Sequence, residues 1–450
     1  MREAQSVRKE GRQKREERSK KSRHTGPDPV SRVIEVLTAL DSGFRRNDDL
    51  VIFCFDALRS ASFEVYIMHF GLTDEQKMIQ EMCRDFARTE LAPRAARLDE
   101  TKDRTILLDN LKKMAELGLM GMNIPEGYGG AQVGPVAYSL AMTEIGRGCA
   151  STAVTMSVTN MVAEVLLEFG TEPVRQKHIP RLCSGEYPAG AFGLTEPGAG
   201  SDPAGMKTTA VLDGDEWVLD GSKIFISSAE YAGVVVVWAV TDKAGEKGKG
   251  ISAFVVEQGT PGYVVGKDEK KMGQKGSSTN ELLFDHCRIP RENLLGQVND
   301  GYRIALMELA GGRIGVGSLS LGIGLAALDY ALEYAKNREQ FGQPIFRFQA
   351  IQWMLADAYT ELEAAQLLVL RSAFLKEQGK PFTREASMGK LYASEAANRA
   401  CYKAVQILGG YGYTAEYPVE RLARDVRVTT LYEGTSEIQR LVISRELLGG

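Results

Sequence analysis

Hydrophobic and polar positions divide the chain into stretches of different texture. Between residues 68 and 187 apolar residues recur with helical spacing, and Thr73 followed three positions later by Gln76 is typical of a capped helix start. From 188 to 295 short β-branched and aromatic runs alternate with turn signals such as Asp213-Gly214, which indicates mainly antiparallel strands. From 296 to 450 long helical patterns return.

The last part shows the clearest helical period, in two stripes of apolar residues spaced by three or four positions. The stripes are Leu321, Leu325, Leu328, Leu332 and Ala335, then Ile351, Leu355, Ala358, Leu362, Ala365 and Val369. We therefore predict an α+β fold with three parts: an N-terminal helical domain (68–187), a middle antiparallel β-domain (188–295) and a C-terminal four-helix bundle (296–450).

Residues 1–67 do not share these patterns. Residues 1–24 hold ten Lys and Arg and hardly any apolar residues, so they cannot bury enough surface to fold alone. The glutamates among them argue against a mitochondrial transit peptide, whereas a basic tail that binds nucleic acid is an alternative. Our interpretation is a disordered segment or an extension from an upstream start, with Met68 as the natural start.

The composition narrows the class of protein. With 450 residues, 44% of them hydrophobic, the chain can bury the cores of two or three domains. A net charge of -4 gives no general attraction to nucleic acid, and the absence of a long apolar run predicts a soluble protein without a membrane partner. Six scattered cysteines without a CxxC pair, and only four histidines, argue against a disulfide framework and a structural metal site.

Two glycine-rich stretches carry candidate chemistry. "FGLTEPGAGSDPAG" (192–205) offers hydroxyls and small residues that let a ligand approach the backbone, although a structural turn is the alternative. "QILGGYGYTAEYPVERLARD" (406–425) places glycines in a helical region, where each costs about 1 kcal/mol. Either a packed helix or a ligand must therefore approach the backbone there.

Together with "NREQFGQPI" (337–345) and "YEGTSEIQR" (432–440), these stretches resemble the acyl-CoA dehydrogenases, in the same order along the chain. The resemblance covers residues 68–450. It implies the three-part fold predicted above, one FAD per subunit, a homotetramer and an FAD-dependent acyl-CoA dehydrogenase activity of the EC 1.3.8 type. It also implies electron-transfer flavoprotein as the electron acceptor.

The resemblance assigns the catalytic base to Glu433. The family removes the α-proton of an acyl-CoA thioester with a carboxylate while the β-hydride passes to FAD, which yields the trans-2-enoyl-CoA. Burial raises the pKa of a carboxylate, which brings it to the range of about 6–7 that suits a general base. Some relatives place the base immediately before an arginine that matches Arg313, but this chain has Gly312 there.

The remaining site residues follow from the resemblance as two groups. The implied FAD contacts are Phe192, Leu194, Thr195, Gly200, Ser201, Phe225, Ile226, Ser227, Arg338, Phe341, Phe348, Gln349, Gln406, Gly409, Gly410, Thr435 and Glu437, some of them from a neighbouring subunit. The implied substrate contacts are Ser201, Ala310, Gly311, Gly312, Arg313, Gly434 and Arg445. The alternatives are a strand-core role for Phe225 and solvated surface charges for Arg338 and Arg445.

The substrate is expected to be a short or short-branched acyl-CoA, because "AGGR" (310–313) and "GSKIFIS" (221–227) look most similar to short-chain members such as isobutyryl-CoA dehydrogenase. Gly311 and Gly312 would widen the space for a methyl branch. The helix at 151–166 is expected to line the acyl pocket, where Met156 and Val158 would shorten it.

The sequence leaves more than one metabolic pathway and more than one reaction open. Fatty-acid β-oxidation and branched-chain amino-acid breakdown both fit, in the cytoplasm of a bacterium or in a mitochondrial matrix. A flavin oxidase or monooxygenase of the same fold, or a non-catalytic relative, are the other functions considered. A non-catalytic scaffold would need neither the base Glu433 nor the cofactor residue Arg338.

Overall fold

A computed structural model describes residues 71–449 of the chain. The interpretation of residues 1–67 therefore lies outside the described residues. The chain divides into the units Met1–Leu72 and Thr73–Gly450, and the fold below is that of the second unit.

The first part of this unit is helical, as predicted. Its α-helices are α4 (Asp74–Phe86), α5 (Ala92–Thr101), α6 (Arg104–Glu116), α7 (Pro135–Gly148), α8 (Ala150–Phe169) and α9 (Glu172–Cys183), with a π-helical turn (Ala87–Leu91) between α4 and α5. The predicted cap is confirmed: Thr73 Oγ1 accepts the Gln76 N–H at 3.2 Å, and the Gln76 side chain accepts the Thr73 N–H at 3.1 Å. α8 is buried along nearly its whole length.

The middle part is a β-domain. Its strands are β1 (Ala189–Gly193), β2 (Thr209–Asp213), β3 (Glu216–Ser227), β4 (Ala232–Val240), β5 (Ile251–Glu257), β6 (Tyr263–Asp268), β7 (Thr279–Pro290) and β8 (Leu294–Leu295). They form one sheet in the order β6-β7-β3-β2-β4-β5-β8, with β1 paired to β4. The pairs are antiparallel except β1–β4 and β2–β4, which are parallel. The sheet is thus mainly antiparallel, as the sequence predicts.

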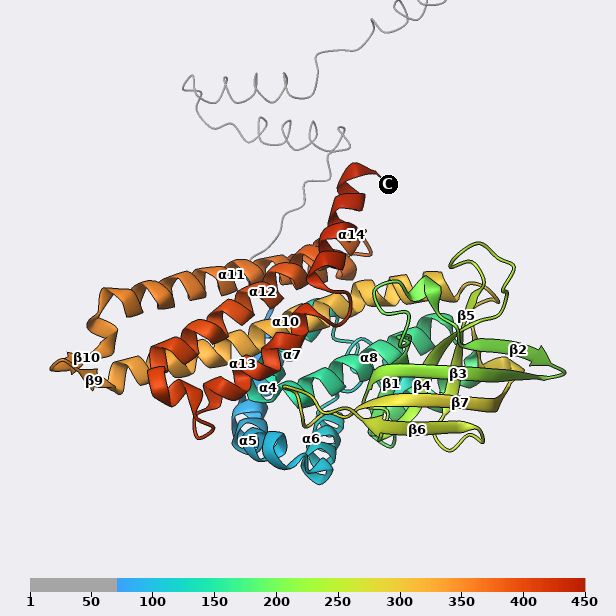
Figure 1. Ribbon diagram of the computed structural model, residues 1–450, viewed down its shortest axis with the longest axis horizontal. Coiled ribbons are helices and arrows are strands. Elements are labelled where there is room, and N and C mark those ends of the chain that lie inside the picture. Colours follow the sequence, from blue (N-terminus) through green and yellow to red (C-terminus); the bar gives the residue numbers. More distant parts are fainter. Residues whose placement is uncertain (1–70, 450) are drawn as a thin grey trace, which may run out of the picture. The chain divides into compact units, whose positions relative to one another are not determined.

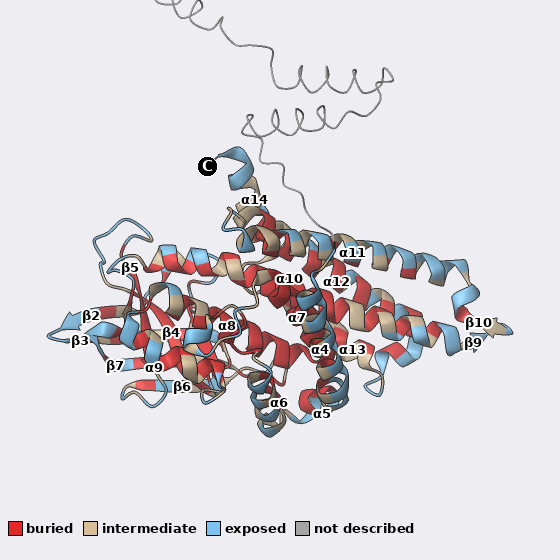
Figure 2. Ribbon diagram, turned by 180° about the vertical axis from the view of Figure 1, so that it is seen from behind, coloured by how far each residue is buried: buried red, intermediate tan, exposed pale blue. Residues whose placement is uncertain are grey.

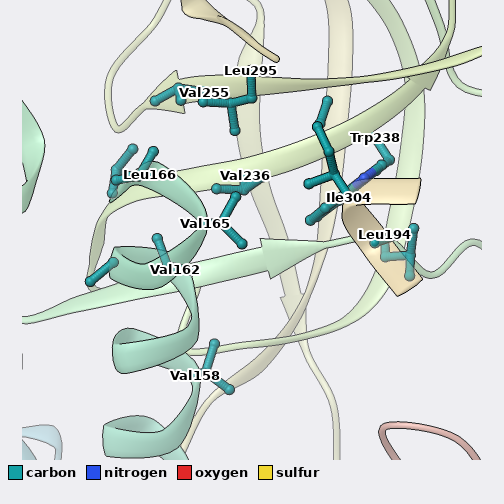
Figure 3. Packing of buried hydrophobic residues seen from close by; sticks show 14 of the residues in the cluster. Val158, Val162, Val165, Leu166, Leu194, Val236, Trp238, Val255, Leu295 and Ile304 are labelled. Atoms are coloured by element: carbon teal, nitrogen blue, oxygen red, sulfur yellow. The ribbon is translucent and has the colours of Figure 1, made fainter. Parts of the chain in front are cut away.

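The β-domain packs on α8 through a buried apolar cluster (Figure 3). Val158, Val162 and Leu166 repeat every four residues along one face of α8 and belong to the same buried cluster as Val236 and Trp238 of β4. Each such side chain contributes about 1.5–3 kcal/mol when it is fully buried. Val158 therefore belongs to the core beneath the sheet, so the expectation that it shortens an acyl pocket is wrong.

The C-terminal part is again helical (Figure 1). It contains α10 (Gly301–Asn337), a short hairpin of β9 (Glu339–Gln340) and β10 (Gln343–Pro344), α11 (Gln349–Glu377), α12 (Thr383–Leu408), α13 (Pro418–Arg427) and α14 (Ser436–Leu448). The facing sides of α10, α11 and α12 are buried (Figure 2), and Leu321, Leu328 and Leu362 of the two predicted stripes lie in this core. The predicted three-part fold class is confirmed.

Among the described residues, the helices Ala150–Phe169 and Gly301–Asn337 are long and apolar enough to cross a membrane by composition. Their most apolar windows are 89% and 78% buried inside the protein, as expected for core helices. The five described cysteines are buried and free.

Candidate active site

Glu433 sits in a strained turn just before α14. Its φ is 51°, in the left-handed region that non-glycine residues seldom adopt, and Gly434 follows with a φ of 90°. The carboxyl oxygen Oε2 is buried and has no hydrogen-bond partner. Burial raises the pKa of Glu433 to about 7, against the opposing charges of Lys390 and Arg313. By contrast, Glu437 is exposed and hydrogen bonds lower its pKa.

Gly312 of α10 faces this carboxyl. A Cβ atom added there would lie 2.4 Å from Glu433 Oε2 and 2.8 Å from Sδ of Met161 on α8. At Gly311 an added Cβ would lie 3.1 Å from Nζ of Lys376. The sequence suggested that the two glycines widen the space for a methyl branch, but the structure leaves no such open room beside them. At 312 the room is taken by the Glu433 carboxyl and by Met161.

Two buried side chains hold the turn by its carbonyl groups. Lys390 Nζ of α12 donates to the Gly434 carbonyl at 2.8 Å. Gln439 Nε2 of α14 donates to the carbonyls of Glu433 and Gly434 at 3.0 and 2.9 Å. Arg313 is buried on α10 and donates to Ser387 Oγ at 3.2 Å, and burial lowers its pKa.

Sequence reasoning found Glu433, Gly312, Arg313 and Gly434, but it missed Met161, Lys390 and Gln439. Lys390 had a readable signal, because it lies on the small, apolar face of a helical pattern with Ala386, Ala393 and Ala397. A charged residue on such a face needs a partner.

A second loop, residues 194–201, follows β1 and is called the flavin loop below. Its Glu196 is buried and accepts Lys223 Nζ of β3 at 2.8 Å and the N–H groups of Lys207 and Thr208 at 2.6 and 3.0 Å. The Thr195 carbonyl accepts the Ile224 N–H at 2.9 Å. The loop is therefore fastened to β3 directly beside Phe225.

Phe225 occupies an irregular position of β3. The ladder to β7 shifts register between Lys223 and Ile226, and Phe225 has a φ of 60°. Such a bulge re-aims a side chain, and the Phe225 ring is 62% exposed whereas Ile226 is buried. The alternative of a strand-core phenylalanine is therefore wrong. Phe192 instead packs its ring on Trp238, with centroids 4.3 Å apart.

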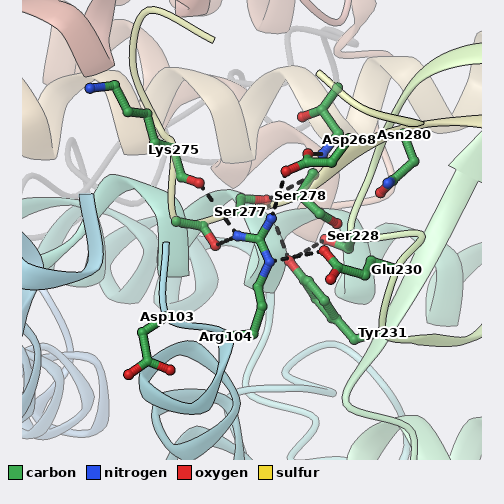
Figure 4. Close-up of polar contacts among 12 residues, drawn as sticks. Asp103, Arg104, Ser228, Glu230, Tyr231, Asp268, Lys275, Ser277, Ser278 and Asn280 are labelled. Carbon is green, nitrogen blue, oxygen red and sulfur yellow. Dashed lines mark hydrogen bonds and ion pairs between the residues drawn. The ribbon is translucent and has the colours of Figure 1, made fainter. Parts of the chain in front are cut away.

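The segment 269–278 between β6 and β7 connects the base turn with β3. Gln274 Nε2 donates to the hydroxyl of Tyr432 at 3.4 Å, next to Glu433, while Ser227 pairs with Thr279 in the β3–β7 ladder. Arg104 of α6 fastens the segment (Figure 4), with contacts to Glu230 and Asp268 at 2.9 and 3.0 Å and to the carbonyls of residues 275 and 276. The base turn and the Phe225 strand thus share one support.

The other predicted cofactor residues gather at the opposite end of α10. The Arg338 guanidinium lies 5.5 Å from the ring centroid of Tyr411, which follows Gly409 and Gly410. Phe341 has a φ of 53°, is 93% exposed and meets Phe348 edge-on, with centroids 5.9 Å apart. Arg338 is 26 residues beyond Gly312, about 39 Å along the helix at 1.5 Å per residue.

Of the remaining predicted residues, Leu194 and Ala310 are buried, and Gln349 begins α11. Gln406, Ser201 and Arg445 are exposed, on α12, the flavin loop and α14. The structure therefore brings the predicted residues into two groups, one around Glu433 and the flavin loop and one at the α10–α11 turn.

The two groups offer what a flat, anionic dinucleotide such as FAD needs. Added Cβ atoms at Gly198, Gly200 and Gly410 would meet nothing within 4 Å, so the packing of this chain does not itself require glycine there. Exposed aromatic rings (Phe225, Phe341) suit a ring system, and an arginine suits a diphosphate. We conclude that these residues fit FAD.

An open cleft of about 590 Å³ lies at the start of α10. Asn299, Tyr302, Arg303, Leu306 and Met307 line it from one side, and Lys249 lines it from the β4–β5 loop. Met307 precedes Gly312 by five residues, so the cleft lies about 8 Å along the axis of α10 from the glycine that faces the Glu433 carboxyl. Sequence reasoning did not identify this cleft.

Comparison with known proteins identifies the family of the chain. The family models for the N-terminal, middle and C-terminal domains of acyl-CoA dehydrogenases match residues 73–186, 191–287 and 299–448. The chain is 50% identical over 378 residues to the mitochondrial short-chain specific acyl-CoA dehydrogenase of Bos taurus, which covers 84% of this chain and 91% of that protein.

Two solved structures are also similar. Butyryl-CoA dehydrogenase from Megasphaera elsdenii has a TM-score of 0.81 at 43% identity, over 85% of this chain and all of that chain. A chain from the study of the electron transferring flavoprotein of Acidaminococcus fermentans has a TM-score of 0.82 at 45% identity, over 85% of this chain and all of that chain. Solved relatives include FAD complexes. The chain is a member of the acyl-CoA dehydrogenase family, an FAD-dependent oxidoreductase of the EC 1.3.8 type.

Proposed function

We propose that this protein dehydrogenates short acyl-CoA thioesters to trans-2-enoyl-CoA, with Glu433 as the base that takes the α-proton. The observation that carries the proposal is the Glu433 carboxyl: it is held in a left-handed turn, its Oε2 is buried without a partner, and burial raises its pKa to about 7. A base with such a pKa is half ionised near neutral pH and still strong enough to accept a proton.

The residues of this chain do the binding and the proton transfer. Glu433 accepts the α-proton, and Lys390 and Gln439 keep its turn in place. FAD, when bound, supplies the acceptor for the β-hydride, so that the acyl chain is oxidised as the cofactor is reduced. Thr195, Gly200 and Phe225 would hold it beside the base, together with their neighbours Phe192, Leu194, Ser201, Ile226, Ser227, Thr435 and Glu437.

We also propose that the cofactor site is completed by a second copy of the chain. Arg338, Phe341, Phe348, Gln349, Gln406, Gly409 and Gly410 lie at the end of α10 that is remote from Glu433. A separation of about 39 Å is too long for one FAD to bridge within one chain. The Phe341 ring is 93% exposed and lies against Phe348, so both rings are available to the surface of a second copy. A homotetramer is the assembly we propose.

The CoA part of the substrate would lie in the cleft at the start of α10. Lys249 and Arg303 suit its phosphates, and Leu306 and Met307 suit its pantetheine chain. From there the thioester would follow α10 past Ala310 and Gly311 to Gly312, Arg313 and Gly434, with Arg445 as a more distant charge. Electron-transfer flavoprotein is the proposed electron acceptor, supported by the similar chain from Acidaminococcus fermentans.

Straight short chains are the favoured substrates, supported by the 50% identity to a short-chain specific enzyme. Branched chains remain part of the proposal through the sequence resemblance alone. An assay of initial rates with butyryl-CoA, isobutyryl-CoA and longer acyl-CoA thioesters decides between them.

The test is anaerobic bleaching of the purified flavoprotein by butyryl-CoA, followed in a stopped-flow spectrophotometer. Glu433→Gln should bind FAD and crotonyl-CoA as the wild type does but lose flavin reduction by several orders of magnitude. Glu446→Gln, which removes an exposed carboxylate from α14, is the matched control and should bleach normally. Bleaching of Glu433→Gln at the wild-type rate would refute the assignment of the base. Rapid reoxidation by oxygen during turnover would indicate an oxidase instead.

A further inference from the structure

Lys390 occupies a position where a lysine is costly. It shares the inward face of α12 with Ala386, Ala393 and Ala397, and it is fully buried. A buried ammonium is unfavourable unless hydrogen bonds and an opposite charge compensate for its lost hydration. Its hydrogen-bond acceptor is the Gly434 carbonyl at 2.8 Å, and Glu433 is the negative group that most raises its pKa. The compensation therefore comes from the base turn itself.

The turn needs such support. A non-glycine residue in a rare backbone region costs on the order of 1–3 kcal/mol and persists only where its surroundings hold it. The Gly434 carbonyl receives two donors, Lys390 from α12 and Gln439 from α14, and the Glu433 carbonyl receives one, from Gln439. Both donors are fully buried. Of these two clamps, only Lys390 carries a charge.

We propose that Lys390 is a positioning residue for Glu433: its ammonium holds the Gly434 carbonyl, fixes the left-handed base turn, and presents a positive charge to the carboxylate. The inference rests on the proposed role of Glu433. It goes further because Lys390, on α12, would control both the position of Glu433 and the pH at which Glu433 ionises.

Other charged and titratable groups also face this pair and influence the pKa values of Glu433 and Lys390. Around Glu433 they are Arg313 and Glu308 of α10, Tyr138 of α7 and the adjacent Tyr432; around Lys390 they are Arg313, Glu395 and Glu437. Arg313 is the other cation beside the base. Loss of Lys390 therefore removes one of the two positive charges that lower the pKa of Glu433. The effect of burial, which raises this pKa, is then opposed by Arg313 alone.

The first test is the pH dependence of flavin reduction by butyryl-CoA. In the wild type the rate should rise with pH as Glu433 ionises, with a midpoint near 7. In Lys390→Met the midpoint should move up by about one pH unit or more, and the rate at pH 7 should fall about fivefold or more. Lys390→Arg retains the charge and should keep the wild-type midpoint, even if the larger side chain lowers the maximal rate.

Lys271→Met is the matched control. Lys271 is another largely buried lysine whose pKa is lowered to about 8 by burial, and it donates to the Ser277 carbonyl and to Thr279 Oγ1 at 2.7 Å. Lys271 lies in the segment that supports the base turn, so its loss should reduce stability and can lower the maximal rate. It should not move the midpoint, because Glu433 is not among the charges that act on Lys271. A structural role for Lys390 predicts the same pattern, namely lower stability or FAD content with an unmoved midpoint, and that result would overturn the proposal.

The second test does not require turnover. A double-mutant cycle of Lys390→Met and Glu433→Gln, measured by urea unfolding, should show a stabilising coupling at pH 7.5 that disappears at pH 5, where Glu433 is protonated. Absence of coupling at pH 7.5 overturns the proposal, whether or not the enzyme reduces its flavin. Coupling without any bleaching of the wild type by acyl-CoA would instead refute the dehydrogenase function while the Lys390–Glu433 contact stands.

Discussion

The base turn and the flavin loop are built on the same device, one buried lysine each, but the lysines have different tasks. Lys223 pairs with the carboxylate of Glu196 at 2.8 Å, and that carboxylate also accepts two backbone N–H groups of the chain. Lys390 donates to a carbonyl, and its charge lowers the pKa of the Glu433 carboxyl, whose Oε2 has no hydrogen-bond partner. One ion pair is closed and structural, whereas the other charge is directed at a group available for chemistry.

The two glutamates show the same difference in their ionisation. Burial alone would raise the pKa of Glu196, but the charge and hydrogen bond of Lys223 and the N–H donors lower it overall. At Glu433 burial dominates and raises the pKa to about 7. A fully hydrogen-bonded carboxylate stays ionised, and a buried carboxyl with a free oxygen becomes a base.

The largest expected effect concerns the packing around the base. In Gly312→Ala the new methyl would lie 2.4 Å from Glu433 Oε2, so the carboxyl must move. A misplacement of about 1 Å costs on the order of 100-fold in rate. We expect that loss in flavin reduction by butyryl-CoA, with FAD content close to wild type, since the flavin loop is not touched.

Gly315→Ala is a useful comparison for this variant, because its methyl would crowd Ser157 Oγ and Tyr138 instead, at 2.6 and 2.7 Å. It should lower stability more than it lowers the rate per bound flavin. Equal rate losses in both variants would show that general disturbance of α10, and not contact with the base, limits the reaction.

The next effect tests whether the flavin loop depends on its ion pair. Lys223→Met leaves the buried Glu196 carboxylate without its cation, which should lower the free energy of unfolding by about 3–5 kcal/mol. Urea unfolding at pH 7.5 measures this loss. The double variant with Glu196→Gln should recover part of it, because the unpaired charge is then gone. A loss in the double variant as large as in Lys223→Met would contradict this account.

The opposite shifts of the two glutamates predict opposite pH dependences of stability. The pKa of Glu433 is raised in the folded protein. Its contribution to the free energy of unfolding is therefore fully present below 4.5, the pKa of glutamate in the unfolded chain, and is lost as pH rises through about 7. Glu433→Gln should therefore gain stability over the wild type between these values, by up to about 3 kcal/mol. For Glu196→Gln the stability relative to wild type should instead fall as pH rises, because the pKa of Glu196 is lowered.

Urea unfolding of both variants from pH 4.5 to 8 distinguishes these cases. Parallel curves for the two variants would mean that both carboxylates are compensated alike, and the contrast between the loops would then be lost.

The sequence predicted what depends on local pattern and missed what depends on contacts between distant segments. The capping box at Thr73 and the apolar stripe through Leu321 and Leu328 are local, and both are confirmed. The helix 151–166 was also found, but Val158 faces the sheet and Met161 faces the base. Helical periodicity gives a buried face and does not say which neighbour covers it.

The candidate site divides in the same way. Glu433, Gly434 and Arg313 belong to short motifs that the sequence displays. Lys390 and Gln439 act through carbonyl groups of another segment, and a backbone carbonyl leaves no trace in a pattern of side chains. The exposed ring of Phe225 depends on a bulge between two strands, which the alternation of residues in "KIFIS" did not indicate.

A smaller effect is expected on the flavin side, where the glycines are not crowded. A methyl at Gly200 would meet nothing within 4 Å, so Gly200→Ala should fold with wild-type stability, within about 0.5 kcal/mol. If FAD approaches this backbone, its dissociation constant should rise about tenfold, or about 1.4 kcal/mol. Fluorescence titration of apoprotein with FAD measures it. Gly127→Ala, exposed and equally uncrowded in another loop, should leave FAD affinity unchanged.

The smallest effect separates the two sides of the base turn. Thr435 caps α14 by accepting the Ile438 N–H at 3.3 Å, and Thr73 caps α4 in the same way at 3.2 Å. Either change to Ala should cost about 1 kcal/mol of stability, measured by urea unfolding. Only Thr435→Ala should also weaken the binding of FAD, since the resemblance places Thr435 on the cofactor side of the turn. Thr435→Ser keeps a capping hydroxyl and should restore both. If Thr435→Ala loses stability alone, Thr435 is a helix cap like Thr73, and the base turn contacts substrate without contacting the cofactor.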